Sequence, residues 1–393
     1  MRGKALKVAV YCDFSYRIDG DAVYAEVSFI RFIEGLAAHC ERLVVVGRLA
    51  PARERFPYRL RAAEFVPLPY YRSGADLAAV LRTIPAAIRR FWRVLDDVDV
   101  VWILGPNPPQ APLFAILGIL RRRKVVLGVR QNLPELIRHR RRGEPVVICS
   151  AHLLERLFRL LSRFVPVVVV GADLARRYRS AKSILGLYVS LLSESDLIGH
   201  DDRRRYDGDE LVALSVGRLD QEKNPLLLVD VLECALEADP RWSLHVCGDG
   251  VLAGALAERA ARVGVGDRLV QHGYVPIDSG LWDLYMHAHV LLHVSMTEGA
   301  PQVILEAFAA RLPVVATAVG GVRDLVAHRG LLVPPGDPAA AAAALARMVA
   351  DPGLRSRVVE AGHRTAADHT LQAECRRLAA FLSATPTAEP RLG

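Results

Sequence analysis

The sequence predicts an α/β protein built from two successive parallel sheets, and three observations support this prediction. The chain has 393 residues, which is long enough for about two domains of ordinary size. Apolar residues make up 52% of it and charged residues 24%, which is typical of a globular chain rather than a disordered one. Short β-branched runs alternate with helical patterns along the whole chain, as parallel sheets made of βαβ units require.

Six apolar runs in the first half are expected to be strands of a Rossmann-like sheet, since each is short, β-branched and bounded by turn residues or charges. They are KVAVYC, RLVVVG, EFVPLP, VDVVWIL, KVVLGV and PVVVVG, which begin at residues 7, 42, 64, 98, 124 and 166. Before the last of them, residues 152–164 (HLLERLFRLLSRF) have the apolar periodicity of an amphipathic helix.

A second series of six runs begins at residue 211, with LVALSVG, WSLHVCG, RLVQHGYV, VLLHVS, PVVATAVG and GLLVPPG. The polar stretch 199–210 is expected to be the linker, which places an N-terminal domain at 1–200 and a C-terminal domain at 201–382. An Ala-rich helix from residue 338 and a further helical pattern close the second domain, and residues 383–393 are expected to be a disordered tail. Parallel sheets bind ligands at the carboxyl ends of their strands, so two facing domains predict an interdomain cleft.

The two halves differ in charge. Residues 1–200 carry 32 Lys and Arg against 18 Asp and Glu, whereas residues 201–393 carry 19 against 25. In 152–164, Arg156, Arg159 and Arg163 lie across from the apolar stripe, which suits a helix on an anionic membrane surface or a core-facing helix with a solvated face. No aromatic residues interleave with the basic clusters as a nucleic-acid stacking platform requires. The expected partner of the first half is therefore an anionic membrane surface, and no nucleic acid is expected.

Cysteine usage and hydropathy indicate the compartment. The six cysteines are scattered, and none lies at metal-ligand spacing, so free thiols in a reducing compartment are expected. The N-terminal apolar run is too short for a signal peptide, and no segment reaches the roughly 18 apolar residues of a spanning helix. The sequence therefore predicts a cytoplasmic protein, peripheral at the inner face of the membrane if 152–164 rests on it.

Candidate cationic residues follow the first strand of the second series, in VGRLDQEKNP. Gly217 permits a tight turn, from which Arg218 and Lys223 can reach the edge of the sheet. Only five lysines occur in the chain, so a lysine beside an arginine here suggests a point charge and a guanidinium fork that together hold a diphosphate. Two solvated surface cations are the alternative.

Two glutamates lie on either side of an expected helix start, in TEGAPQVILEA. Pro301 is expected at the first helical position, and the N–H groups there form an anion site. If residues 298–306 were all helical, Glu298 and Glu306 would be about 12 Å apart along the axis, as the two hydroxyl-bearing ends of a nucleotide sugar require. The carboxylates of a glycosidase flank one bond at about 5 to 9.5 Å, which disfavours that class. Alternatively, Glu298 caps the helix and Glu306 faces solvent.

The second half resembles the donor domain of retaining glycosyltransferases of family 4 (glycosyltransferase group 1), whose GT-B fold has two facing Rossmann-like domains. The resemblance covers roughly residues 215–338, and its motifs are, in family order, SVGRLDQEKNP, HVCGDG, VQHGYV, TEGAPQVILEAFAARLPVVATAVGG and GLLVPPGDP. It implies a retaining, metal-independent transferase that uses a UDP- or GDP-linked sugar as co-substrate and needs no cofactor.

The resemblance also implies residue roles. Arg218 and Lys223 would bind the donor diphosphate and stabilise the leaving nucleotide, while Glu298 would contact the donor sugar and Glu306 the ribose. Other residues would shape the donor site: Gly217 in its first turn, Gly299, Ala300, Pro301 and Gln302 as a backbone cradle, and Tyr274 and Val275 beside the base.

The first half departs from the family pattern. Only Gly20 remains of the glycine pair after the first strand, and Arg130 and Gln131 stand where a histidine often follows a middle strand. The Asn-Gly turn near the end of the N-terminal domain is missing. Gly20 is the candidate for contact with the diphosphate, and Asn107, Arg130 and Gln131 are the candidates for contact with the acceptor.

Three other functions compete with this interpretation. A dehydrogenase would need GxGxxG with an acidic residue about 20 positions on, which no loop supplies. An epimerase or phosphorylase of the same fold would lack these donor motifs. A catalytically impaired relative would bind a nucleotide sugar without turning it over. The sequence predicts a glycosyltransferase of bacterial glycolipid or polysaccharide biosynthesis. Its expected partners are a nucleotide sugar donor and a sugar, lipid-linked or small-molecule acceptor, with a natural-product acceptor as the alternative.

Overall fold

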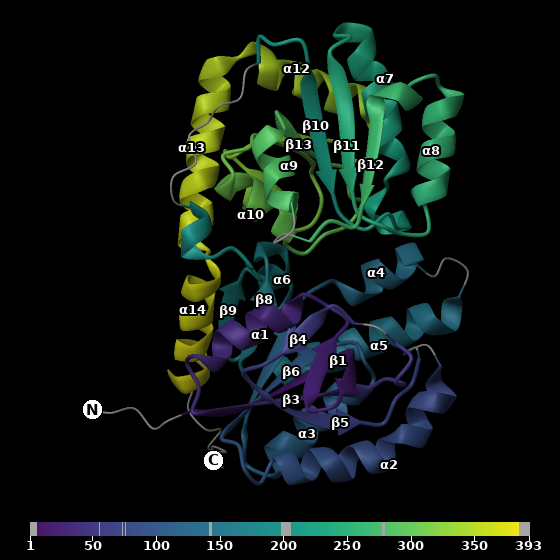
Figure 1. Ribbon diagram of the computed structural model, residues 1–393. Helices are drawn as coiled ribbons and strands as arrows, with labels where there is room; N and C mark the ends of the chain where they lie inside the picture. Colours follow the sequence, from purple (N-terminus) through teal and green to yellow (C-terminus); the bar gives the residue numbers. More distant parts are fainter. Residues whose placement is uncertain are drawn as a thin grey trace. The chain divides into compact units, whose positions relative to one another are not determined.

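The computed structural model describes residues 6–54, 56–72, 74, 76–140, 144–197, 206–276 and 280–384. The chain divides into two compact units, one comprising Met1–Leu191 and Leu371–Gly393 and the other Leu192–Thr370. Each unit holds one β-sheet flanked by helices (Figure 1). The predicted α/β class with two parallel-sheet domains is therefore confirmed.

The sheet of the first unit runs in the order β4-β2-β1-β6-β7-β8-β9, and β3 and β5 extend it beside β1. Its strands pair in parallel except where β2 joins β1 and β4. All six predicted strands are present, whereas the short strands β2, β4 and β9 were not predicted. The antiparallel strands β2 and β4 lie outside the βαβ pattern, and β9 (ILGL) has a glycine in its interior. The bounds are β1 Lys7–Asp19, β2 Ala22–Ala25, β3 Arg42–Leu49, β4 Tyr58–Leu60, β5 Glu64–Leu68, β6 Val100–Gly105, β7 Lys124–Val129, β8 Val167–Val170 and β9 Ile184–Leu187.

Helices α2, α3 and α5 pack on one face of this sheet. Phe91, Phe114 and Phe158, one from each helix, are fully buried in the same core, and the rings of Phe91 and Phe114 stack with centroids 4.2 Å apart. The predicted amphipathic helix is the second part of α5. The helices of this unit are α1 Phe29–Ala37, α2 Leu77–Val94, α3 Gln110–Leu120, α4 Leu133–Arg140, α5 Pro145–Ser162, α6 Ala172–Arg177 and α14 Leu371–Ala384.

The second unit has a fully parallel sheet in the order β12-β11-β10-β13-β14-β15, and all six strands predicted for it are present. Its strands are β10 Leu211–Val216, β11 Trp242–Cys247, β12 Leu269–Gly273, β13 Val290–His293, β14 Val314–Thr317 and β15 Leu331–Val333. Its helices are α7 Leu226–Ala238, α8 Ala253–Arg262, α9 Trp282–His287, α10 Gln302–Ala309, α11 Val322–Val326, α12 Pro338–Ala350 and α13 Pro352–Asp368, with short 3₁₀ turns η1 Glu194–Leu197, η2 Gln221–Lys223 and η3 Gly266–Arg268.

The limits of the units differ from the predicted domain limits. Residues 192–197 group with the second unit, and α14 groups with the first. Two contacts hold α14 there: Cys375 Sγ lies 3.5 Å from the Phe32 carbonyl oxygen, and Arg377 donates to the Gly186 carbonyl over 2.8 Å. The sequence placed α14 in the second domain because helical periodicity shows that a helix has an apolar face. It does not show which of two cores that face packs against. The linker residues 199–205 and the tail residues 385–393 lie outside the described residues, and residues 383 and 384 end α14.

Candidate functional site

Three loops meet at the carboxyl edge of the second sheet, because they follow the neighbouring strands β10, β13 and β14. The Met296 amide donates to the Glu222 carbonyl over 2.9 Å, which joins the first loop to the second. The Gly321 amide donates to the Glu298 carbonyl over 3.2 Å, which joins the third loop to the second. Chain segments about a hundred residues apart therefore build one site.

The Glu298 carboxylate is the centre of this site. Its side chain is 7% exposed, and its Oε1 atom forms an ion pair with the Lys223 ammonium. Ser295 Oγ donates to the same oxygen over 2.9 Å, and His293 Nε2 lies 3.2 Å from it. Burial by itself would raise the pKa of Glu298, but Lys223 and His293 outweigh it and hold that pKa well below the usual value for a glutamate. Glu298 is therefore ionised, with one oxygen occupied by these three groups.

Two glycines press against the backbone of the same loop. A Cβ on Gly320, whose φ is +40°, would lie 2.0 Å from the Glu298 carbonyl oxygen. A Cβ on Gly321 would lie 1.7 Å from the Gly299 carbonyl oxygen. Both distances are far inside van der Waals contact, so only glycine lets the third loop support residues 298–300 from behind.

Arg218 and Lys223 reach this edge from η2 and the turn before it, as predicted for the loop after β10. Arg218 is 54% exposed and pairs with Asp220 and, over 2.7 Å, with Glu222, whose side chain is only 4% exposed. Neither cation is therefore a simple solvated surface charge. The carboxylates orient the guanidinium, and a guanidinium has five N–H donors, so Arg218 retains donors for a ligand.

Helix α10 begins later than the spacing argument assumed. Pro301 is the N-cap, with a ψ of 126°, and Gln302 is the first helical residue. The premise that residues 298–306 are all helical is therefore wrong, and so is the placement of Pro301 at the first helical position. The physical reason is that proline disfavours helical geometry at the residue before it, here Ala300. Gln302 and Glu306 do lie one turn apart on α10.

Glu306 faces the protein interior, which overturns the alternative that it faces solvent. It is 6% exposed, and the Tyr285 hydroxyl donates to its Oε2 atom over 2.8 Å. Burial raises the pKa of Glu306 to about 7, Tyr285 opposes this rise, and Asp196 adds to it. Glu306 is therefore a carboxyl group that exchanges its proton near neutral pH.

This pKa predicts a pH-dependent stability. Because the pKa of Glu306 rises from the ordinary value near 4.5 to about 7 on folding, the folded state holds an extra proton between these values, and stability falls as pH rises through that window. Glu306→Gln, which cannot ionise, is expected to raise the free energy of unfolding by about 3 kcal/mol at pH 8, since one pKa unit corresponds to about 1.4 kcal/mol. The gain should vanish below pH ~4.5, as urea titrations at both pH values would test. An equal gain at both values would contradict the prediction.

Tyr274 and Val275 follow β12, at the other end of the same edge. The Tyr274 amide donates to Asp249 Oδ2 over 3.1 Å, and the tyrosine side chain is 53% exposed. The loop after β11 approaches the loop after β10 closely, since a Cβ on Gly248 would lie 1.9 Å from the Gly217 carbonyl oxygen. The exposed ring can therefore stack on a planar ligand beside the cationic loop.

Sequence reasoning missed several residues of this site. His293 and Ser295 lie within the run VLLHVS and contact Glu298, and Tyr285 on α9 contacts Glu306. A polar residue in an otherwise apolar strand, such as His293, was the one available signal. Tyr285 offered none, because its contact with Glu306 depends on the packing of α9 against α10.

The acceptor candidates lie at the carboxyl edge of the first sheet. Asn107 follows β6 and Arg130 and Gln131 follow β7, and these strands are paired, with Gly105 opposite Val129. Burial lowers the pKa of Arg130 to about 10, and its guanidinium lies 4.3 Å from the centre of the Phe29 ring. Gly20 occupies the tip of the hairpin between β1 and β2, rather than a strand-to-helix loop.

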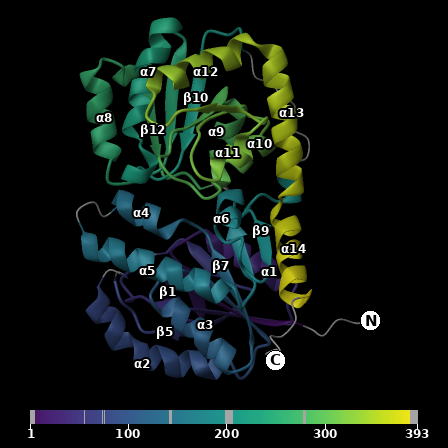
Figure 2. The ribbon, with the colours of Figure 1, turned by 180° about the vertical axis from the view of Figure 1, so that it is seen from behind.

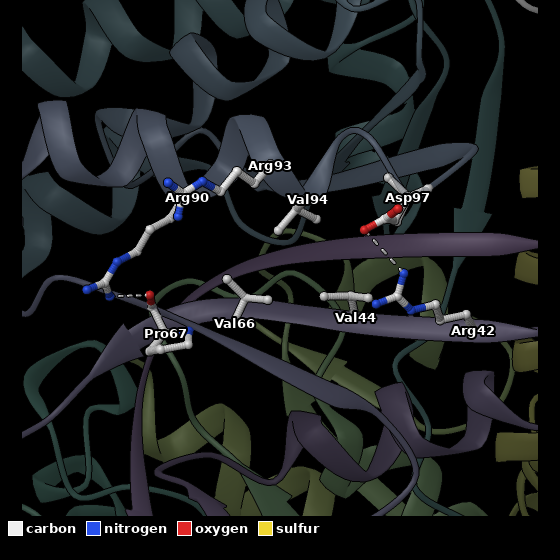
Figure 3. A pocket seen from close by; sticks show the side chains of 9 residues that line it. Arg42, Val44, Val66, Pro67, Arg90, Arg93, Val94 and Asp97 are labelled. Carbon is white, nitrogen blue, oxygen red and sulfur yellow. Dashed lines mark hydrogen bonds and ion pairs between the residues drawn. The ribbon is translucent and has the colours of Figure 1, made fainter.

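A separate pocket of about 340 Å³ lies between α2 and the strands β3 and β5 (Figure 3). Its walls are largely apolar, and none of the predicted site residues lines it. Arg42 and Asp97 pair across 3.7 Å, and Arg90 donates to the Pro67 carbonyl over 2.6 Å. The lining residues are Arg42, Val44, Val66, Pro67, Arg90, Arg93, Val94, Asp97 and Val98.

Residues 200–365 match the family model described as glycosyl transferases group 1. The chain is 36% identical over 163 residues to a D-inositol 3-phosphate glycosyltransferase of Streptomyces bingchenggensis. The aligned region covers 38% of this chain and 35% of that protein. It is 25% identical over 385 residues to the phosphatidyl-myo-inositol mannosyltransferase of Mycobacterium leprae, with 91% of each chain covered. The match to the first of these relatives thus spans about a third of that protein's length.

Solved structures share the fold. HepE of Anabaena, crystallised in complex with UDP, superposes with a TM-score of 0.70 at 17% identity, over 97% of this chain and 100% of that chain. A sucrose-phosphate synthase of Thermosynechococcus elongatus gives a TM-score of 0.67 at 18% identity, with 96% and 98% covered. At such identities the likeness concerns the fold alone.

Proposed function

We propose that this chain transfers a sugar from a nucleoside-diphosphate sugar to an acceptor hydroxyl, because residues 200–365 match the glycosyl transferases group 1 family and the fold is that of GT-B glycosyltransferases. The observation that carries this proposal is the buried Glu298–Lys223 pair at the carboxyl edge of the second sheet. Arg218 belongs to the same loop as Lys223, and α10 begins at Gln302, shortly after Glu298.

In this proposal the donor lies along that edge. The diphosphate meets Lys223, the remaining donors of Arg218, and the positive end of the α10 dipole at its N-terminus. The second oxygen of Glu298 accepts sugar hydroxyls, and Glu306 accepts ribose hydroxyls once it is ionised. Tyr274 and Val275 flank the base. The complexes of HepE with UDP and with UDP-glucose support a donor of this class.

The chemistry of the step is electrostatic. The bond between the anomeric carbon and the diphosphate oxygen breaks, a bond from that carbon to the acceptor oxygen forms, and the acceptor proton passes to the departing phosphate. Negative charge grows on the diphosphate, where Lys223, Arg218 and the helix start stabilise it. We propose that these groups make a metal ion unnecessary and that the sugar keeps its configuration, because the acceptor approaches on the face that the nucleotide leaves.

The first unit is proposed to bind the acceptor through Asn107, Arg130 and Gln131. A half-buried guanidinium among aromatic rings favours an acidic acceptor. The similarity to a D-inositol 3-phosphate glycosyltransferase and a phosphatidyl-myo-inositol mannosyltransferase supports this choice. A glycolipid or polysaccharide precursor in the cytoplasm fits this description.

A metal-free calorimetric panel of UDP, GDP, ADP and NAD tests the donor site. One nucleoside diphosphate is expected to bind, and Arg218→Ala to weaken its binding by about 1.5 kcal/mol or more, the loss of a charge-assisted hydrogen bond. Arg262→Ala, which removes an exposed arginine from α8, is the matched control and should leave the affinity unchanged.

Each other outcome of the panel is also informative. Binding of NAD alone would contradict the proposal. Binding of a nucleoside diphosphate without hydrolysis or transfer of any nucleotide sugar would mark the chain as a catalytically impaired relative. Activity that depends on an added divalent cation would contradict the proposed metal independence.

A further inference from the structure

Exposed apolar side chains gather on one part of the first unit. Among the described residues, fourteen large apolar side chains are exposed, and nine of them lie on α2, on α3, or on α5 and the turn after it. Single exposed apolar residues are ordinary on a protein surface, but a gathering on neighbouring helices indicates a contact surface. The nine are Leu81, Trp92, Ile116, Ile119, Leu120, Val146, Leu153, Leu160 and Phe164.

The three helices present these side chains outward together. Their inner sides share one core on one face of the sheet, and α3 contacts both α2 and α5, so the three lie side by side (Figures 1 and 2). On α5, the exposed residues Val146, Leu153 and Leu160 recur every seven positions, which places them on one stripe. The outward sides of α2, α3 and α5 therefore form a continuous surface, termed here the helical face.

The helical face is also strongly cationic. Its three helices contain a single acidic residue, Glu155, which is 2% exposed and pairs with Arg177 over 2.8 Å. Four acidic residues lie next to the helices: Asp96 and Asp97, which follow α2, pair with Arg121 and Arg42, and Asp76 and Glu144 are the N-caps of α2 and α5. Eight arginines on or next to the helices are exposed: Arg82, Arg89, Arg90, Arg93, Arg122, Arg156, Arg159 and Arg163.

We propose that the helical face docks on an anionic lipid bilayer. Guanidinium groups bind lipid phosphates, while the apolar side chains between them enter the boundary between headgroups and acyl chains. A second copy of the chain would bring arginine against arginine, because a twofold interface is self-complementary, and like charges oppose such contacts. Arg90 and Arg93 also line the apolar pocket beside α2 (Figure 3). An anionic lipid could therefore place its headgroup at these arginines and its apolar part in the pocket.

Vesicle sedimentation with the full chain tests this proposal. The protein is expected to bind vesicles containing phosphatidylglycerol at least about tenfold better than vesicles of phosphatidylcholine alone, and less as salt rises. Each basic residue near an anionic surface contributes about fivefold, so Arg156→Glu/Arg163→Glu should reduce binding by more than about tenfold. The matched control, Arg262→Glu/Arg268→Glu in the second unit, makes the same charge change elsewhere and should bind like the wild type.

A second pair of variants tests the apolar contribution. Leu153→Ser/Leu160→Ser changes side chains that are 67% and 49% exposed, so the protein should fold normally and lose vesicle binding. Val251→Ser, at a position that is 83% exposed in the second unit, is the control. Calorimetry of the nucleoside diphosphate with the same variants should give the wild-type affinity, so failure of docking and failure of the proposed function are distinguishable.

Three results would overturn the proposal. One is equal binding to neutral and anionic vesicles, or no binding to either. Another is an equal loss of binding in the Arg262→Glu/Arg268→Glu control. The third is a concentration-dependent dimer that Leu153→Ser/Leu160→Ser converts to monomer while vesicle binding persists, which would assign the helical face to a second copy of the chain.

Discussion

Lys223→Ala is expected to reduce sugar transfer by about a hundredfold to a thousandfold, as loss of one preorganised donor to the departing phosphate predicts. The same substitution should lower the free energy of unfolding by about 3 kcal/mol, because it leaves the Glu298 carboxylate buried and ionised without its ammonium partner. Turnover of the nucleotide sugar and urea unfolding measure the two effects.

A second substitution separates stability from activity. Lys223→Ala/Glu298→Gln removes the buried charge together with its partner, so the free energy of unfolding should return to within about 1 kcal/mol of the wild type while transfer stays lost. Lys7→Ala is the matched control, since Lys7 and Glu41 pair over 3.5 Å with side chains 42% and 48% exposed, and its effect should stay below about 0.5 kcal/mol. A double variant no more stable than Lys223→Ala would show that Glu298 does not depend on Lys223.

Gly321→Ala is expected to weaken nucleotide binding at least about tenfold and to cost about 1–3 kcal/mol of stability, the usual range for overpacking. The added Cβ would meet the Gly299 carbonyl oxygen at 1.7 Å, and a backbone atom cannot rotate away as the end of a side chain can. Residues 298–300 must therefore shift, which moves Glu298 away from Lys223. Calorimetry and urea unfolding measure the two losses.

Gly254→Ala is the control for this glycine. Gly254 lies in the first turn of α8, and nothing is within 4 Å of an added Cβ. This change should be neutral or should stabilise the protein by up to about 1 kcal/mol, because alanine favours a helix more than glycine does. Wild-type nucleotide affinity in Gly321→Ala would contradict the role given to the loop after β14.

The strands were predictable from local pattern, because a buried parallel strand is apolar on both faces and reads as a continuous run. The short strands β2 and β9, AVYA and ILGL, were missed because β2 is an antiparallel strand outside the βαβ pattern and the glycine in β9 weakens the strand signal. Predicted candidates such as Arg218, Lys223 and Glu298 follow strands directly, and the neighbouring positions of β10 and β13 bring them together. Their assigned roles toward a donor stay predictions.

The state of each carboxylate was beyond local pattern. Glu298 and Glu306 are both glutamates at the edge of one apolar run, yet Glu298 has a lowered pKa and Glu306 a raised one. The difference comes from partners distant in the chain: Lys223 supplies a positive charge to Glu298, whereas burial acts on Glu306 with only a tyrosine hydroxyl to oppose it. Such partners are set by packing, which spacing along the chain does not encode.

The sequence by itself determined the α/β class, the strands of two parallel sheets, the charge asymmetry and the loop residues that carry the chemistry, since each depends on the nature of a residue and its near neighbours. The tertiary structure alone decided that α14 packs in the first unit, that Gly320 and Gly321 support the Glu298 loop, and that the exposed stripes of α2, α3 and α5 form one surface. The spacing of apolar residues along a helix or strand shows which of its sides is buried. Which neighbouring element packs against that side depends on close packing among residues far apart in the chain.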